Sequence, residues 1–430
     1  MTRLACKRFY IRTFGCQMNV YDGRRIENML ACSGYEKTDK VSDADIIILN
    51  TCSVREKATD KVFSELGRIR KAKKPGALFG ITGCTAREAG AAAFERIPEM
   101  NFVLGPQSYH KLKEVLENPD ARHLQIDLSG LEKFDELPKM TRSESAAYIP
   151  VQEGCGHGCS YCIVPWTRGR ELSRPFDDAL ADVAQAAKQG AVEICFLGQN
   201  VNGYKYNLAS LIKETAKLDT VKRIRYTSSY PTEMTDELIG LHGTEPKLLP
   251  FLNLPIQSGS DNILRAMNRD YGKDEYKIII EKLKKARPDT QISSDFIVGF
   301  PGETERDFEM TCEMAREMEF INSYSFKYSP RPRTLAATMP NQIPDAVKRE
   351  RLKILDAILG DNMRKFNESC KGKIFDCLLE NKDRFGNLVY RTPFMQQTIV
   401  RTDARANTMA KIKITDGNKC SLRGELCECE

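Results

Sequence analysis

Apolar stretches alternate with amphipathic stretches along the first 140 residues. Apolar runs that fit strands end at a cysteine three times, and residues with helical spacing follow each run. The strands are expected at residues 8–14, in DIIILNTC and in ALFGITGC, and the helices over residues 22–32, 55–73 and 85–96. A fourth round begins at NFVLG. Strands that alternate with helices predict a parallel sheet with helices on its faces.

The three cysteines of these runs occupy equivalent places. Cys16, Cys52 and Cys84 each stand just past the end of a predicted strand. Because the carboxyl ends of parallel strands lie along one edge of a sheet, where ligands bind, the three thiols are expected to converge in space. The alternative is three buried structural cysteines, since free cysteine is among the most buried residue types. Identical placement after three successive strands favours a three-thiolate metal site.

The same alternation continues from about residue 141 to residue 370. It opens with the predicted strand AYIPVQEG, and the remaining elements follow in turn. Strands are expected at 192–198, 223–228, 250–254, 291–298 and 322–328, with helices over 176–189, 208–217, 235–242, 274–287, 304–319 and 344–369. Six strand–helix rounds predict a partial, open form of the (β/α)₈ barrel, in which chemistry takes place at the C-terminal ends of the strands.

A glycine-rich loop, EGCGHGCSYC, follows the first strand of this segment. It holds Cys155, Cys159 and Cys162 and no fourth cysteine nearby, whereas a zinc ribbon needs four ligands in two pairs. Three thiolates can hold three irons of a cubane cluster and leave the fourth iron open, and soft sulfur ligands favour iron–sulfur chemistry. The alternative is a loop of chance or buried cysteines, because short motifs give false matches.

Polar residues gather at the predicted strand ends of the same segment. They are Gln199, Asn200, Ser228, Gln257 and Asp295. Donors and acceptors of this kind suit the binding of a polar organic cofactor. The alternative for each residue is ordinary helix capping by Ser, Asn or Asp.

Short alternating strands separated by turn residues fill the last sixty residues. KIFDCLLENK, NLVYRTP, QQTIVRT and AKIKITD predict a small β-barrel over residues 371–430. Its aromatic residues Phe375, Phe385, Tyr390 and Phe394 are interleaved with lysines and arginines. Such a mixture supplies a nucleic-acid surface when the rings are exposed, although aromatic residues are more often part of a core.

Composition narrows the class of protein. The chain of 430 residues, 41% apolar and 29% charged, is an ordinary globular protein with room for two or three domains. Fifteen irregularly spaced cysteines predict metal ligands or buried thiols in a reducing compartment. No signal-peptide core and no membrane-length apolar run is present, so a cytoplasmic protein is expected. The net charge of +6 permits a polyanionic partner.

The motif CxxxCxxC, with Tyr161 before its last cysteine, resembles the signature of radical-SAM enzymes. Nearly the whole chain resembles the radical-SAM methylthiotransferases. GCQMNVYD, NTCSVREKA, VPWTRGRELSRP, LGQNVNGY and DFIVGFPGET look like the branch of that family that acts on tRNA. The resemblance implies an auxiliary-cluster domain over residues 1–140, a radical-SAM core over 141–370 and a TRAM β-barrel, which binds RNA, over 371–430.

The resemblance also implies roles for residues. Cys155, Cys159 and Cys162 would hold the radical-generating [4Fe-4S] cluster, and Cys16, Cys52 and Cys84 an auxiliary [4Fe-4S] cluster. Tyr161 and the five polar strand-end residues would contact S-adenosylmethionine. One departure is SPRPRTLAATMP, where Arg333 and Leu335 stand in place of the glycine and the proline common in the family.

The implied reaction is methylthiolation of C2 of N6-isopentenyladenosine at position 37 of tRNA. Sulfur would be inserted through the auxiliary cluster, and S-adenosylmethionine would supply the methyl group. The expected partners are the anticodon stem-loop carrying that base, an electron donor such as flavodoxin or ferredoxin, and a sulfur donor, with the enzyme acting as a monomer. The alternatives are methylthiolation of threonylcarbamoyladenosine in tRNA or of a ribosomal protein, and a non-catalytic iron–sulfur protein that binds RNA or carries electrons.

Overall fold

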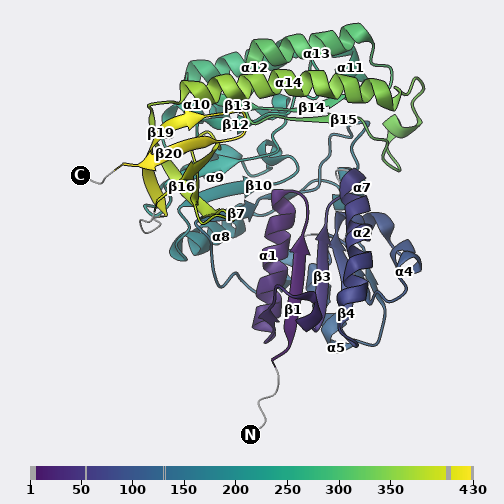
Figure 1. Ribbon diagram of the computed structural model, residues 1–430. Helices are drawn as coiled ribbons and strands as arrows, with labels where there is room; N and C mark the ends of the chain where they lie inside the picture. The colour runs from purple at the N-terminus through teal and green to yellow at the C-terminus, as the bar shows by residue number, and fades with distance from the viewer. Residues whose placement is uncertain (1–5, 54–55, 129, 131, 403–407, 428–430) are drawn as a thin grey trace.

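The computed structural model describes residues 6–53, 56–128, 130, 132–402 and 408–427. Two α/β units and a small β-barrel follow one another along the chain (Figure 1). None of the helices in these ranges combines the length and the apolar character that crossing a bilayer requires.

The first unit is a six-stranded parallel sheet in the order β2-β1-β3-β4-β5-β6. Its apolar central strand β3 is buried along its whole length. One apolar cluster joins the sheet to α2, α3 and α4, and a second joins it to α1 and α5. The strands are β1 (Arg8–Thr13), β2 (Glu36–Lys37), β3 (Ile46–Thr51), β4 (Leu78–Gly83), β5 (Phe102–Leu104) and β6 (His123–Gln125), and the helices α1 (Gln17–Cys32), α2 (Glu56–Ala72), α3 (Cys84–Ala89), α4 (Ala92–Arg96), α5 (Leu112–Glu117) and α6 (Glu132–Glu136).

The second unit places parallel strands side by side in chain order. Strands β7, β10 and β11 form one sheet, and β12–β13 and β14–β15 form parallel pairs that single bridges connect to it and to each other. The strands are β7 (Ala146–Pro150), β10 (Glu193–Leu197), β11 (Arg223–Tyr226), β12 (Phe251–Asn253), β13 (Gln291–Ser293), β14 (Asp295–Val298) and β15 (Tyr324–Lys327), with a short antiparallel pair β8 (Gln152–Glu153) and β9 (Leu172–Ser173).

Helices cover the outer side of these strands. Figure 1 shows α12, α13 and α14 as a layer over β13, β14 and β15. The large apolar core of the unit lies between the strands and the helices that follow them. The helices are α7 (Val164–Arg168), α8 (Phe176–Lys188), α9 (Leu208–Ala216), α10 (Asp236–Thr244), α11 (Asp261–Ala266), α12 (Lys273–Ala286), α13 (Glu305–Met318) and α14 (Asp345–Ser369).

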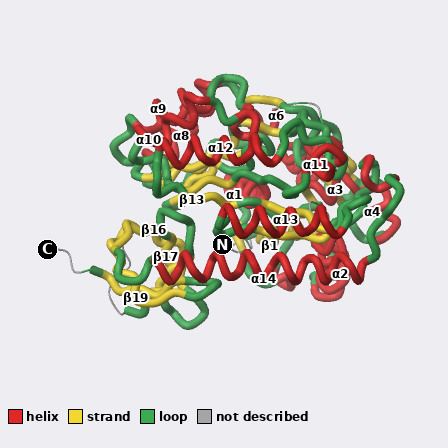
Figure 2. The backbone as a smooth tube through the Cα atoms, turned by 90° about the horizontal axis from the view of Figure 1, so that it is seen from above, coloured by secondary structure: helices red, strands yellow, loops and turns green. Residues whose placement is uncertain are grey.

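The C-terminal unit is a closed five-stranded barrel in the order β16-β17-β18-β20-β19. Its strands are β16 (Ile374–Lys382), β17 (Leu388–Arg391), β18 (Gln397–Val400), β19 (Met409–Gly417) and β20 (Leu422–Leu426). Figure 2 shows α14 running beside α13 and reaching the barrel. Arg223 of β11 donates hydrogen bonds to the carbonyl groups of Arg391 and Thr392, which fastens the barrel to the core.

The predicted α/β class, the N-terminal parallel sheet and the C-terminal barrel are confirmed. Three local details differ. The helix expected over 85–96 is two helices, because Gly90 adopts φ +52° between them. The strand expected over 291–298 is interrupted at Ser294. Strands β2, β6, β9 and β20 and helices α6, α7 and α11 were not predicted, since runs of two to six residues carry little periodicity.

Candidate metal centres

The cysteines of the N-terminal sheet lie together at its carboxyl edge. Cys16 caps α1 directly after β1, Cys52 follows β3, and Cys84 begins α3 directly after β4. The thiols of Cys16 and Cys52 are hydrogen-bonded to each other, and Cys84 interacts electrostatically with Cys16. Gly15 permits this approach, because a Cβ there would stand 2.3 Å from the Cβ of Cys52. We call these three residues the sheet triad.

The thiols of the sheet triad differ in how easily they ionise. The hydrogen bond from Cys52, together with the cation of Arg168, lowers the pKa of Cys16 to about 6 against the opposing effect of burial. Burial raises the pKa of Cys84. As a whole residue Cys16 is exposed, although protein atoms surround its thiol, whereas Cys52 and Cys84 are buried. The triad therefore offers one thiol that ionises easily at a helix N-terminus, the setting that favours a thiolate.

Arg168 is the buried cation beside the sheet triad. Its Nε donates to the Sγ of Cys84 at 3.3 Å, and its two terminal nitrogens reach Glu153, Asp22 and Asn19 at 2.7, 3.0 and 2.8 Å. The side chain is 2% exposed. All three nitrogens of the guanidinium therefore have a partner in a buried region, which fixes its position relative to the sulfur.

A second buried cation completes this charge cluster. Lys133 of α6 donates to Asp22, Glu153 and the carbonyl oxygen of Pro106 at 3.3, 2.9 and 3.0 Å, and it is 1% exposed. Tyr109 also donates to Asp22, at 3.1 Å. Two carboxylates are thus balanced by two cations. The cluster draws on α1, α6, β8 and α7, so it ties the N-terminal sheet to the core, and buried charges are tolerated when they are paired in this way.

The second set of cysteines lies in the loop after β8. Cys155, Cys159 and Cys162, here called the loop triad, interact electrostatically with one another, and Arg269 donates to the Sγ of Cys159 at 3.4 Å. Burial raises the pKa of Cys155, and raises that of Cys162 to about 12. Burial therefore disfavours the thiolates of Cys155 and Cys162, and a metal that binds these two residues must displace their protons.

Neighbouring strand ends hold the loop in place. Gln199 accepts a hydrogen bond from the N–H of Gly154 at 2.6 Å. Asn268 donates to the carbonyl oxygens of His157 and Gly158 at 3.3 and 3.0 Å. The imidazole of His157 stacks on the ring of Tyr230, with centroids 3.4 Å apart. The position of the loop is thus set by residues that follow β10, β11 and α11.

One short segment touches both triads. The N–H of Cys155 donates to the carbonyl oxygen of Gly169 at 3.3 Å, and the preceding residue, Arg168, donates to Cys84. Gly154 has φ +79°, and a Cβ there would stand 2.1 Å from the carbonyl oxygen of Arg170. Residues 168–170 therefore contact residues of both triads and fix one triad relative to the other.

The polar residues proposed as cofactor contacts have different surroundings. The side chain of Gln199 is engaged with the cysteine loop, and the amide of Asn200 donates to Glu171 at 3.0 Å. Ser228 and Gln257 have φ +65° and +75°. The carbonyl oxygen of Asp295, at the start of β14, accepts from the N–H of Gln257 at 2.9 Å. Tyr161 is packed against Phe300, edge to face.

The donor sets suit sulfur-bound clusters. Within the ranges that the structure describes, the only three His, Cys, Asp or Glu ligand atoms within 4.8 Å of one another belong to His110, Glu132 and Glu136. A single tetrahedral zinc ion would hold its sulfur ligands roughly 3.8 Å apart. Within the described residues, neither cysteine triad brings all three of its sulfur atoms that close together. In addition, each has an arginine that donates to a sulfur, the second-shell contact typical of iron–sulfur centres.

The strand ends beside the loop triad suit an organic ligand with donor groups. The Oδ1 atom of Asn200 is buried and accepts no hydrogen bond. Ser228 and Gln257 hold left-handed backbone conformations, which are costly for residues other than glycine and collect at ligand sites. These features fit the amino and ribose groups of S-adenosylmethionine.

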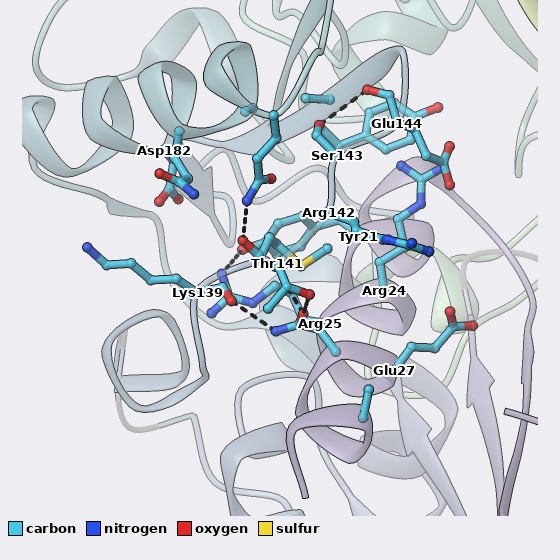
Figure 3. A pocket seen from close by; sticks show the side chains of 18 of the residues that line it. Tyr21, Arg24, Arg25, Glu27, Lys139, Thr141, Arg142, Ser143, Glu144 and Asp182 are labelled. Carbon is cyan, nitrogen blue, oxygen red and sulfur yellow. Dashed lines mark hydrogen bonds and ion pairs between the residues drawn. The ribbon is translucent and has the colours of Figure 1, made fainter. Parts of the chain in front are cut away.

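A separate cavity of about 510 Å³ lies where α1 meets β7 and α8 (Figure 3). No cysteine lines it. On its floor Arg25 and Asn28 of α1 donate to the carbonyl oxygens of Leu137 and Lys139, at 3.1 and 3.0 Å. The cavity therefore lies where residues 137–144, which connect the two α/β units, attach to α1. It is separate from the metal centres.

Reasoning from the sequence missed the charged residues around the triads. Arg168 lies in the quoted motif VPWTRGRE, but no role followed from the motif alone. Asp22, Lys133 and Glu153 carry no local signal, because their pairing depends on how the sheet and the core meet. Arg269 likewise reaches Cys159 from 110 residues away.

Comparisons with known proteins agree with this layout. The model of Uncharacterized protein family UPF0004 matches residues 8–105, and that of the Radical SAM superfamily matches residues 149–315. The tRNA-2-methylthio-N(6)-dimethylallyladenosine synthases of Rickettsia akari and Rickettsia canadensis are each 45% identical to this chain, over 98% of it and 99% of their own lengths.

Solved structures resemble the fold at low sequence identity. The radical S-adenosylmethionine methyltransferase TsrM from Kitasatospora setae has a TM-score of 0.58 at 12% identity, over 77% of this chain and 75% of that one. The cobalamin-dependent S-adenosylmethionine radical enzyme OxsB has a TM-score of 0.51 at 11% identity, over 82% and 56%. These likenesses concern the fold alone. By its full-length relatives and its two matching domains, the chain belongs to the family of tRNA-2-methylthio-N(6)-dimethylallyladenosine synthases.

Proposed function

We propose that this chain methylthiolates C2 of N6-isopentenyladenosine at position 37 of tRNA. The names of its full-length relatives support the substrate and the product. The observation that carries the proposal is that residues 168–170 contact both cysteine triads. The target C2–H of adenine has no acidic proton and no leaving group, so general acid–base catalysis offers little and cofactor chemistry is required.

The six cysteines are the proposed metal ligands. Cys155, Cys159 and Cys162 hold a [4Fe-4S] centre with S-adenosylmethionine beside it, and Cys16, Cys52 and Cys84 hold an auxiliary [4Fe-4S] centre. When bound, these groups supply the one-electron chemistry, the sulfur and the methyl group. Tyr161, Gln199, Asn200, Ser228, Gln257 and Asp295 surround the S-adenosylmethionine. Three units follow, with the auxiliary centre in residues 1–140, the radical-SAM core in 141–370 and a TRAM barrel in 371–430.

The protein's own residues position and insulate these groups. Arg168 holds Cys84 in place and excludes water from that side of the sheet triad, since it and its four partners are buried. Gln199 and Asn268 fix the loop triad through backbone contacts. Rigid support of this kind matters because small displacements of reacting groups cost large factors in rate.

RNA recognition is assigned to the barrel and to the rim of the site. In the barrel Tyr390 and Phe394 are buried, Phe375 is half-buried, and Phe385 is 74% exposed with the guanidinium of Arg384 over its ring at 4.7 Å. Phe385 is therefore the aromatic platform for a base or a ribose. The further partners are a flavodoxin- or ferredoxin-type electron donor and a sulfur donor. The proposed enzyme is a monomer in the cytoplasm, where cysteines that form no disulfide are usual.

The direct test is reconstitution with iron and sulfide under anaerobic conditions. The protein is then assayed with S-adenosylmethionine, a reductant and three substrates: isopentenylated tRNA, threonylcarbamoylated tRNA and ribosomal protein. Mass spectrometry is expected to find the 2-methylthio product on the first substrate only. Product from one of the others would reassign the substrate, and no S-adenosylmethionine cleavage with any of them would favour a non-catalytic iron–sulfur protein.

A further inference from the structure

The loop between β15 and the 3₁₀ turn at Leu335–Thr338 contains an arginine in an unfavourable backbone conformation. Arg333 has φ +67°, a region that side chains other than glycine rarely adopt. Its side chain is exposed, and its guanidinium lies over the ring of Trp166 at 4.5 Å from the centroid. Within the described part of the chain, Arg333 makes no hydrogen bond or ion pair. Backbone strain of this kind collects at functional positions.

Trp166 lies just before residues 168–170, the segment that contacts both triads. It stands on α7, four residues after Cys162 and two before Arg168. A second cation, Arg87, lies over the same ring at 5.3 Å, and it stands on α3 three residues after Cys84. The half-buried indole thus contacts one arginine from the N-terminal unit and one from the core. We call the surface around Trp166 the rim of the site.

Two arginines of this region have N–H donors without a hydrogen-bond acceptor. Arg331 is 7% exposed, yet its Nη2 is buried without a hydrogen-bond partner, and so is the Nε of Arg87. The nearby acid is Glu88; burial raises its pKa, against the effect of Arg331, and its Oε2 atom is also buried without a hydrogen-bond partner. Among the described residues, none of Arg87, Arg331 and Arg333 forms an ion pair with a carboxylate. Buried donors without acceptors are expensive, so a ligand rich in acceptor oxygens fits here.

We propose that Arg87 and Arg333, which lie over the ring of Trp166, and Arg331, two residues before Arg333, bind a backbone phosphate of the substrate RNA next to the nucleotide being modified. The inference rests on the proposed function, because it assumes an RNA substrate whose target base enters between the two triads. Guanidinium groups match the geometry of phosphate oxygens, and an indole beside them accepts a stacked base or ribose. Arg333 is then a specificity and positioning residue that the loop holds in place at the expense of backbone strain.

Replacing Arg333 by glycine distinguishes a role in RNA binding from a role in protein stability. The R333G variant removes the cation and also relieves the positive φ, so its Tm is expected to equal or exceed that of the wild type. Affinity for a fluorescein-labelled anticodon stem-loop carrying isopentenyladenosine, measured by anisotropy on the reconstituted full-length enzyme, is expected to fall three- to tenfold. The slope of log K against log[salt] is expected to decrease in magnitude by about one phosphate contact.

Two controls make the result decisive. Asn341 is exposed and also has a positive φ, +58°, so N341G relieves strain without removing a charge and is expected to bind RNA like the wild type. R333K keeps the charge and is expected to retain the salt slope. Trp166 is the single tryptophan of the chain, so its emission reports directly on the rim, and RNA is expected to change it in the wild type but less in R333G.

Unchanged RNA affinity and salt slope in R333G would overturn the inference while leaving the proposed function intact. A lower Tm in R333G with unchanged binding would show that Arg333 only braces Trp166, and would also overturn it. If the wild-type enzyme itself failed to bind the isopentenylated stem-loop, the proposed function would fail first, and the inference with it.

Discussion

The two cysteine triads each receive a hydrogen bond from one arginine, but the two arginines stand in opposite surroundings. Arg168, at the sheet triad, is fully buried and faces the carboxylates of Asp22 and Glu153. Arg269, at the loop triad, is half-buried and lies over the rings of Tyr230 and Tyr271, at 4.7 and 5.4 Å. Among the described residues no carboxylate forms an ion pair with Arg269.

This difference shows how the same three-thiol chemistry is supported in two ways. At the sheet triad the charges are already paired before any metal binds, and one thiol ionises near pH 6. At the loop triad burial raises the pKa values of Cys155 and Cys162, so their thiolates form together with metal binding. The first site is preorganised by ion pairs within the protein. The second depends on its ligand for its charge.

The largest effect is expected from removing one sulfur from each triad. Cys159→Ala should abolish both S-adenosylmethionine cleavage and methylthio product, because the loop triad supports the first chemical step. Cys84→Ala should retain cleavage and lose only the product. Both variants should keep about half of the iron of the wild type, as measured together with acid-labile sulfide after anaerobic reconstitution. Equal loss of cleavage in both variants would mean that the two centres do not work independently.

The two arginines should differ in their contribution to stability. Arg168→Met leaves Asp22 and Glu153 with fewer partners in a buried cluster, and breaking such a pair costs about 3–5 kcal/mol. Arg269→Met removes a cation–π contact and a hydrogen bond to sulfur, which together amount to about 1–2 kcal/mol. Denaturant unfolding of the metal-free protein measures both. Arg168→Lys should recover only part of the loss, because an ammonium group cannot reproduce the fork. If both substitutions lowered the free energy of unfolding equally, the two arginines would not differ in the way proposed.

Substituting the glycine beside each triad should impair only the cluster of that triad. Gly15→Ala places a Cβ against Cys52, and Gly154→Ala places one against Arg170, each at a positive φ. Overpacking and backbone strain of this kind cost about 2–4 kcal/mol. Each variant is expected to lose the spectroscopic signal of its own cluster and to keep the other. Gly156→Ala is the matched control, because its Cβ would meet nothing within 4 Å, and it should load both clusters. Loss of both signals in either test variant would argue for one shared site.

Much of this architecture was predictable from the sequence, because periodicity is a local property. The placement of Cys16, Cys52 and Cys84 after three strands predicted that they would meet, since a parallel sheet has only one carboxyl edge. The cluster of Arg168 with Asp22, Glu153 and Lys133 was not predictable. It arises where separate units meet, and nothing in the sequence near a charged residue says which distant charge it will pair with.

The smallest effect, and the most direct test of the electrostatic contrast, is the reactivity of the thiols in metal-free protein. Cys16 is exposed and its pKa is about 6, so its alkylation by iodoacetamide should fall with a midpoint near pH 6 as the pH is lowered and should level off above pH 7. Cys162, with a pKa of about 12, should stay nearly unreactive over that range and react faster only at alkaline pH. At pH 6 Cys16 should react about tenfold faster than an ordinary thiol, because its larger thiolate fraction outweighs its lower nucleophilicity.

Peptide mapping by mass spectrometry measures each cysteine separately, and Cys32, exposed at the end of the same helix α1, is the internal control. Arg168→Met should move the midpoint for Cys16 to higher pH, because the cation that favours its thiolate is gone. The midpoint for Cys162 should not move, since Arg168 is not among the groups that shift its pKa. A profile for Cys16 that matched the profile for Cys32 would show that the sheet triad is not charged in advance of its metal, and that both sites acquire their thiolates only on binding.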